Sequence, residues 1–121
     1  MSGEEKDVLK AVGIDYEDGL THFAGRAGLY EKYLKRFVSD QTFLSLEEAM
    51  GACDYETAFR SAHTLKGIVG TLGMAEFARE VASIVEMLRG QADVKGAIAA
   101  FPSLQQDRQR LAGVVAEYFG L

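Results

Sequence analysis

Residues 54–73 read DYETAFRSAHTLKGIVGTLG, and their pattern is that of one amphipathic helix. Apolar side chains recur three and four residues apart, which places them on a single helical face. Asp54 is suited to cap the first turn, and the stretch from Gly70 to Gly73 is suited to end the helix. We therefore predict a helix over 55–71. Its buried stripe comprises Phe59, Ala62, Leu65, Val69 and Leu72.

The same period continues toward the N-terminus. Asp15 is expected to cap a short helix over 16–24, and residues 4–12 can add a turn or two before it. A longer helix is expected over 28–51, but its apolar stripe changes phase. Tyr30, Tyr33, Leu34, Phe37 and Leu44 share one stripe, whereas Phe43, Leu46 and Met50 lie on another. We expect a kink or short break within 39–42, because it would let both halves face one core.

Toward the C-terminus, a helix over 75–89 is predicted to end at Gly90, which suits the left-handed C-terminal cap. Its apolar stripe contains Phe77, Val81, Ile84, Val85 and Leu88. The last segment starts near Asp93 and is interrupted by Pro102, after which Ser103 to Gln106 reads as a capping box. One kinked helix and two consecutive helices both fit this segment.

The fold class follows from this periodicity, because no segment alternates apolar and polar residues in the way that a β-strand requires. The prediction is an all-α protein. Long amphipathic helices joined by short loops favour an antiparallel up-down four-helix bundle with a short extra N-terminal helix. A length of 121 residues suits one core, so residues 1–121 are expected to form a single domain.

Composition narrows the possible partners. A formal net charge of −5 argues against nucleic acid, whose binders usually carry a clustered basic surface. No stretch approaches the roughly 20 apolar residues of a membrane helix, and the polar, acidic start does not resemble a signal peptide. We expect a cytoplasmic protein that binds neither nucleic acid nor membranes. The single Cys53 is expected to be a free thiol.

The chain has two histidines in different settings. His22 lies between Leu20 and Phe23 with no other ligand-type residue at a useful spacing, so we expect a surface or half-packed side chain. His63 falls about 120° or more from the centre of the apolar stripe of its helix. The imidazole of His63 should therefore face solvent.

Three residues share the side of the helix on which His63 lies: Lys66, Gly67 and Gly70, at three, four and seven positions further on. Each glycine costs about 1 kcal/mol relative to alanine inside a helix, so two beside one exposed histidine require a reason. Close approach of another macromolecule to the imidazole supplies that reason. We interpret Gly67 and Gly70 as clearance for a partner.

An exposed neutral imidazole is a competent nucleophile toward a phosphoryl group near neutral pH. The ammonium of Lys66 could neutralise phosphate oxygens in the product and in the transition state. The sequence shows no metal-binding motif, no nucleotide-binding loop and no second catalytic acid. A partner would have to bring the rest of the active site.

The run from Ala62 to Met74, AHTLKGIVGTLGM, resembles the signature of histidine-containing phosphotransfer (HPt) domains, an H-x-L-K-G core followed by an L-G step. The resemblance extends to residues 13–15 and to the Asp54 turn, includes Tyr30 and Phe37, and weakens after residue 90. It implies a helical bundle whose exposed histidine exchanges phosphate with the aspartate of a receiver domain. The family's histidine, lysine and glycine correspond to His63, Lys66 and Gly67. We expect a monomer without a cofactor, with Mg²⁺ only in the partner receiver domain.

One departure from the family concerns the neighbouring helix. Many HPt domains have a glutamine or another polar residue where this chain has Val85, which cannot hydrogen-bond the imidazole or phosphate. Arg89, one turn further along, could reach the same site as a secondary phosphate contact. Two alternatives to a receiver-dependent phosphocarrier stay open. One is an interaction module with the same fold but no phosphotransfer, and the other is a histidine domain phosphorylated by a kinase with ATP.

Overall fold

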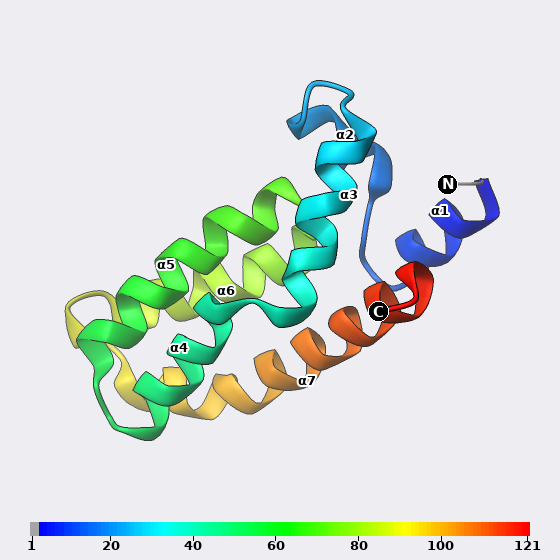
Figure 1. Ribbon diagram of the computed structural model, residues 1–121. Helices are drawn as coiled ribbons and strands as arrows, with labels where there is room; N and C mark the ends of the chain where they lie inside the picture. Colours follow the sequence, from blue (N-terminus) through cyan, green and yellow to red (C-terminus); the bar gives the residue numbers. More distant parts are fainter. Residues whose placement is uncertain (1–2) are drawn as a thin grey trace.

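The computed structural model describes residues 3–121, and no strand occurs among them (Figure 1). The prediction of an all-α protein is confirmed. No helix in the described part of the chain is long and apolar enough to cross a membrane. The elements in order are α1 Gly3–Ala11, α2 Tyr16–His22, α3 Ala27–Arg36, the short 3₁₀ turn η1 Phe37–Ser39, α4 Gln41–Gly51, α5 Tyr55–Thr71, α6 Ala75–Leu88, the 3₁₀ turn η2 Arg89–Gln91 and α7 Val94–Phe119.

Aspartate side chains begin four of the helices, namely α2, α4, α5 and α7, and two of these caps were predicted. Asp15 accepts a hydrogen bond from the backbone N–H of Asp18 at 3.1 Å, and Asp54 accepts one from Thr57 at 3.2 Å. Asp93 caps α7 in the same way. These carboxylates satisfy N–H groups that have no partner within the first turn of a helix.

The region predicted as one helix over 28–51 is broken into α3 and α4 by η1. Asp40 is extended there and accepts a hydrogen bond from the N–H of Thr42 at 3.1 Å, which starts α4. The predicted break is therefore confirmed, but the predicted burial is wrong in part. Tyr33 is 40% exposed and Leu44 is 44% exposed. Leu44 lies on a separate helix, so a stripe drawn at one phase across both helices does not apply to it.

Of the two alternatives for the last segment, one helix is right and two consecutive helices are wrong. The predicted cap at Ser103 is also wrong, because Ser103 lies inside α7, which continues through Pro102 to Phe119. A proline inside a helix removes one backbone donor and crowds the carbonyl four residues before it, but the buried side chains of Phe101 and Leu104 keep the helix packed on the core. Gly90 adopts the predicted left-handed conformation, with φ of 58°.

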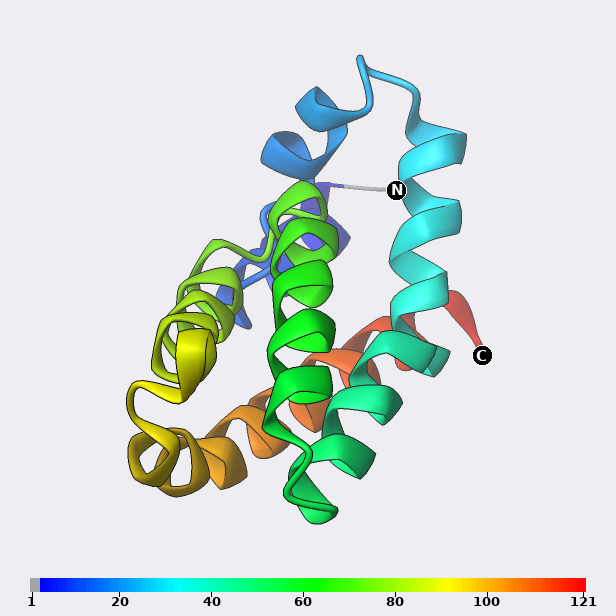
Figure 2. The same ribbon diagram turned by 90° about the vertical axis from the view of Figure 1, so that its left-hand side faces the viewer.

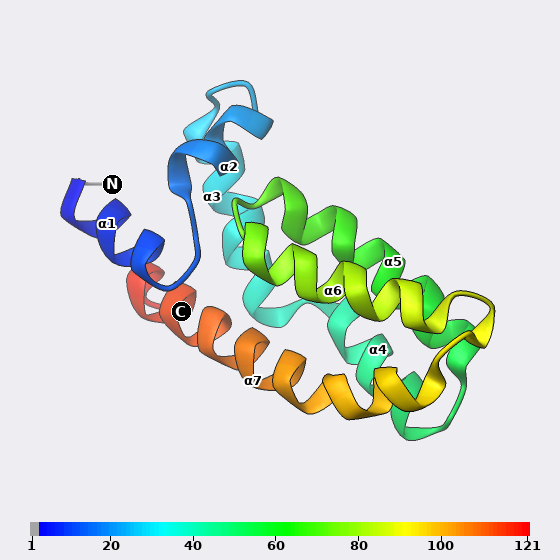
Figure 3. The same ribbon diagram turned by 180° about the vertical axis from the view of Figure 1, so that it is seen from behind.

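Helix α5 is the centre of the packing, with α4 on one side and α6 on the other, and α6 packs in turn against α7. Figures 1 and 3 show α7 running along the base of this layer, with α1 beside its C-terminal end. Figure 2 shows α4 and α5 side by side, while α3 leads up toward α2. Buried apolar residues of α1 to α7 form one continuous core.

Helix α3 and the start of α2 are tied to the segment that ends α5 by hydrogen bonds to its carbonyl groups. The hydroxyl of Tyr30 donates a buried hydrogen bond to the carbonyl of Leu72 at 2.8 Å, and the N–H of Asp15 donates one to the carbonyl of Gly73 at 2.8 Å. Gly73 has φ of 81°, and a Cβ atom there would collide with the backbone of Asp15. Only glycine therefore fits this junction.

Glu80 of α6 gives the fold a pH-dependent contact with α7. Burial, followed by a hydrogen bond with Asp107, raises the pKa of the Glu80 carboxyl from 4.5 to about 7. The folded state thus binds a proton that the unfolded state releases. Stability should be highest near the ordinary pKa of glutamate and should fall as the pH rises from about 4.5 to about 7.

Thermal unfolding between pH 4 and pH 8 tests this expectation. We expect E80Q to flatten the decline in melting temperature over that interval, because glutamine keeps the hydrogen bond without titrating. E117Q, a change at an exposed glutamate of α7, should leave the decline as it is. An equal decline in E80Q and in the unsubstituted chain would show that Glu80 is not its source.

Candidate functional site

His63 lies near the middle of α5 with its side chain exposed, as the helical phase predicted. The adjacent residues Ala62 and Leu65 are fully buried in the core. The helix backbone is therefore anchored on both sides of His63, while the imidazole stays outside the packed interior. A nucleophile on a rigid element is held in place without being shielded from a partner.

The surface beside His63 is open at both predicted clearance positions. A Cβ atom built on Gly67 or Gly70 meets no other atom within 4 Å, and neither residue has the positive φ that favours glycine. Nothing within the described chain therefore requires glycine at either position. This geometry is what the clearance hypothesis needs, and the hypothesis itself stays a prediction.

The turn η2, which directly follows α6, contributes a cation from outside α5. The guanidinium of Arg89 lies over the ring of Phe59, 5.0 Å from its centroid, and that ring lies 6.0 Å from the imidazole of His63, centroid to centroid. The guanidinium of Arg89 is therefore linked to the imidazole of His63 through the ring of Phe59, which lies between η2 and α5. Lys66, on α5 itself, is half-buried one turn beyond His63.

Glu86 completes this surface and was not anticipated from the sequence. Its carboxylate accepts two hydrogen bonds from Arg89, from Nε and from a terminal nitrogen, both at 3.1 Å. Arg89 is the main cause of a lowered pKa of the Glu86 carboxyl, and the positive charges of Lys66 and His63 lower it further. The spacing of three residues between Glu86 and Arg89 was a readable signal for the ion pair.

Val85, which stands where many HPt domains are expected to carry a polar residue, does not face the surface that bears His63. Its side chain is fully buried in the core, and the exposed residue next to it is Glu86. Val85 therefore offers no hydrogen bond to the imidazole. The polar groups on this side of His63 are Glu86 of α6 and Arg89 of η2.

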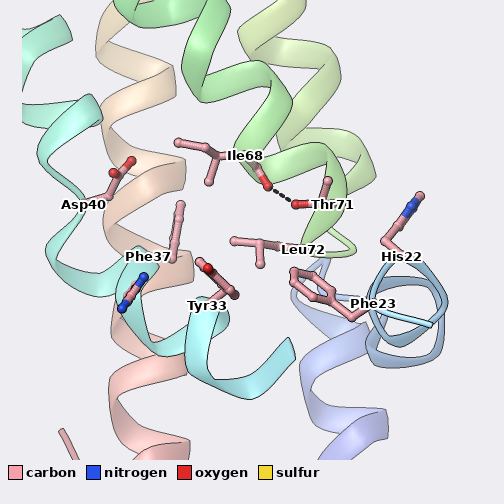
Figure 4. Close-up of a pocket in the computed structure, with 9 residues that line it drawn as sticks. His22, Phe23, Tyr33, Phe37, Asp40, Ile68, Thr71 and Leu72 are labelled. Atoms are coloured by element: carbon pink, nitrogen blue, oxygen red, sulfur yellow. Dashed lines mark hydrogen bonds between the residues drawn. The ribbon is translucent and has the colours of Figure 1, made fainter. Parts of the chain in front are cut away.

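A separate apolar groove of about 470 Å³ lies between α2, α3 and the end of α5 (Figure 4). The rings of Phe23 and Tyr33 stack within it at 5.6 Å, so Tyr33 lines a groove where the sequence predicted core. His22 lies at its rim, where its imidazole extends away from the apolar side chains and pairs with Asp18 at 3.6 Å. His63 is not among the lining residues, which are His22, Phe23, Tyr33, Arg36, Phe37, Asp40, Ile68, Thr71 and Leu72.

Of the two surfaces, only the one on α5 and α6 joins an exposed imidazole to cationic side chains from two helices. Such an arrangement can accept a phosphoryl group and balance its charge. Between residues 3 and 121, no three His, Cys, Asp or Glu side chains are grouped in the way a metal ion requires.

Comparison with known proteins identifies the same region. The family model described as the Hpt domain matches residues 37–114, which contain α4, α5, α6 and most of α7. No curated protein and no solved structure matches the chain. The matched region covers more than half of the chain and carries His63 with its neighbours on α5 and α6. The chain therefore belongs to the Hpt domain family of histidine-containing phosphotransfer modules.

Proposed function

We propose that the chain is the histidine phosphotransfer protein of a two-component phosphorelay. His63 accepts a phosphoryl group from the aspartate of one receiver domain and passes it to the aspartate of another. The observation that carries this proposal is an exposed imidazole on a rigid helix, with open space at Gly67, Lys66 one turn further along, and Arg89 over the Phe59 ring that neighbours His63. Membership of the Hpt family supports it, because Hpt domains generally interact with receiver domains.

The proposed step is a direct displacement at phosphorus. The lone pair of an imidazole nitrogen of His63 forms the new P–N bond as the P–O bond to the receiver aspartate breaks. The electrons of that bond return to the aspartate as a carboxylate. The receiver supplies Mg²⁺, and the chain itself needs no cofactor.

Lys66 and Arg89 are proposed to balance the charge of the phosphoryl group. Transition states of phosphoryl transfer are stabilised mainly by positioned positive charge, and the two side chains approach from different helices. Gly67 and Gly70 keep the approach of the receiver clear. Helices α4 to α7 would act as an antiparallel four-helix bundle that holds this surface, in one domain over residues 1–121.

The proposed partners are receiver domains of response regulators or hybrid histidine kinases. The chain would act as a cytoplasmic monomer and as a carrier rather than an enzyme, since the receiver brings the remaining catalytic groups. Nucleic acid and membranes are not proposed as partners, in keeping with the net charge of −5.

Replacing Lys66 by alanine should slow transfer by roughly tenfold, because a positive charge near the reacting phosphoryl group is lost. Stability should change little, because the side chain is only half-buried. Single-turnover transfer from a phosphorylated receiver measures the effect. K10A, which removes an exposed lysine of α1, serves as the control and should transfer normally. An unchanged rate in K66A would remove Lys66 from the mechanism.

The phosphate donor distinguishes the proposed function from the two alternatives, an interaction module and a kinase substrate domain. In one reaction the chain meets a phosphorylated receiver, and in a second it meets a histidine kinase with ATP and no receiver. Labelling only in the first supports the proposal. Labelling only in the second identifies a kinase substrate domain. The absence of labelling in both identifies an interaction module, the alternative that the buried Val85 favours.

A further inference from the structure

The phosphotransfer step proposed above gives no role to Glu86, the ion-pair partner of Arg89. A set of contacts nevertheless leads from Glu86 to His63 through Arg89 and Phe59. The carboxylate of Glu86 bonds the guanidinium of Arg89 at 3.1 Å, the guanidinium lies 5.0 Å from the centroid of Phe59, and that ring lies 6.0 Å from His63. The hydrogen bonds to Glu86 therefore hold the guanidinium of Arg89 over the ring of Phe59.

The ion pair between Glu86 and Arg89 is weak enough for Arg89 to exchange Glu86 for another anion. The side chains of Arg89 and Glu86 are 52% and 65% exposed, and exposed ion pairs between residues three apart are weak. The pair also spans a single turn at the end of α6, so breaking it does not open the core. Arg89 can therefore leave Glu86 without unfolding its helix.

A phosphoryl group on His63 would compete strongly for the same guanidinium. It carries up to two negative charges and three acceptor oxygens, against one charge and two oxygens on Glu86. The same group would also repel the Glu86 carboxylate, because both carry negative charge and Glu86 is close enough for the charge of Lys66, one turn from His63, to act on it. Both effects favour the transfer of Arg89 from Glu86 to the phosphoryl group.

We propose that Glu86 is a positioning residue that holds Arg89 beside His63 in the unphosphorylated chain and releases it to the phosphoryl group when His63 is phosphorylated. This inference rests on the proposed function. The inference gives Glu86 the role of the counter-ion that Arg89 exchanges for the phosphoryl group. It also implies that the negative charge of Glu86 disfavours phosphorylation of His63.

Substitution of the two partners separates exchange from simple structural support. E86Q and R89Q both break the ion pair. If the pair only stabilises the end of α6, both variants should alter phosphorylation in the same direction or leave it unchanged. If Arg89 is exchanged, E86Q removes a repelling charge and frees the guanidinium, whereas R89Q removes the cation that the phosphoryl group needs. The two variants should then change the rate in opposite directions.

Phosphoramidate is the probe, because it needs no partner protein. Its P–N bond breaks with departure of ammonia as the imidazole nitrogen of His63 forms a new P–N bond. Phosphorylation of the full chain is followed by ³¹P NMR. We expect E86Q to react about threefold faster and R89Q about threefold slower than the unsubstituted chain, as weak interactions between exposed charges allow.

The matched controls are E17Q and K6Q. Glu17 and Lys6 form an ion pair at 2.9 Å on α2 and α1, helices that carry neither His63 nor Glu86. These variants make the same kinds of change in charge away from α5 and α6, and both should react at the unsubstituted rate. Equal effects of E17Q and E86Q would show a general charge effect and would overturn the inference.

An NMR titration of the Glu86 carboxyl provides a second readout. On phosphorylation its pKa should rise, because Arg89, the main cause of the lowered value, has moved to the phosphoryl group. If the chain is phosphorylated but the pKa of Glu86 does not change, this inference alone is overturned. The same holds if E86Q and R89Q change the phosphorylation rate in the same direction. A chain that takes no phosphate at all overturns the proposed function together with it.

Discussion

Replacing His63 by glutamine or alanine is expected to abolish phosphorylation and to leave the helices folded. The imidazole is exposed, while the packing of α5 depends on its buried neighbours Ala62 and Leu65. Surface substitutions away from packed or capped positions usually change stability by less than about 0.5 kcal/mol. Incubation with a phosphorylated receiver, followed by measurement of bound phosphate, should give no labelled chain. Circular dichroism should show unchanged helix content.

The second histidine provides the control for this experiment. His22 is also exposed on a helix and pairs with Asp18, but it lies at the rim of the apolar groove and not among the cations near His63. H22Q should therefore accept phosphate at the unsubstituted rate. Labelling that persists in H63Q and disappears in H22Q would place the phosphoacceptor on α2 and contradict the assigned site.

Replacing Gly67 by leucine is expected to cause the second large loss of phosphotransfer. The leucine side chain would stand one turn from the imidazole, and apart from the adjoining residues and the local backbone of α5 no atom lies within 4 Å of the new Cβ. It would therefore block the receiver and not the fold. Single-turnover transfer should fall by roughly a hundredfold, since small misplacements of reacting groups cost about that much. The melting temperature should not fall.

Alanine at Gly67 and at Gly70 is the control for added bulk. Each should stabilise the helix by up to about 1 kcal/mol, because both positions have helical backbone and no clashing neighbour. Transfer by G67A should fall far less than transfer by G67L. Normal transfer by G67L would refute clearance as the reason for the glycines, and unfolding of either alanine variant would indicate that these residues are needed for packing.

The sequence was sufficient wherever local patterns decide the structure. The phase of α5 placed His63 on the exposed side, and the acids at 15 and 54 marked the starts of two helices. The slip in the apolar stripe located the break between α3 and α4, because only separate helices could bury both halves. These features depend on residues within one or two turns of each other.

Features that depend on contacts between helices were not predictable in the same way. The continuity of α7 through Pro102 results from burial of Phe101 and Leu104 against other helices. The position of Glu86 near His63 depends on the register between α5 and α6, which periodicity within each helix does not fix. The exposure of Tyr33 likewise depends on Phe23, a residue of another segment.

The account is tested most directly by locating the phosphoryl group after transfer from a purified, phosphorylated receiver. The chain is isolated, its phosphate content is measured, and the modified residue is identified by peptide mass spectrometry under alkaline conditions that preserve phosphohistidine. We predict one phosphoryl group for each chain, labile in acid and stable in base, on the peptide that contains His63. Phosphate on any other residue, or failure to accept phosphate from every receiver of the source organism, would contradict the account.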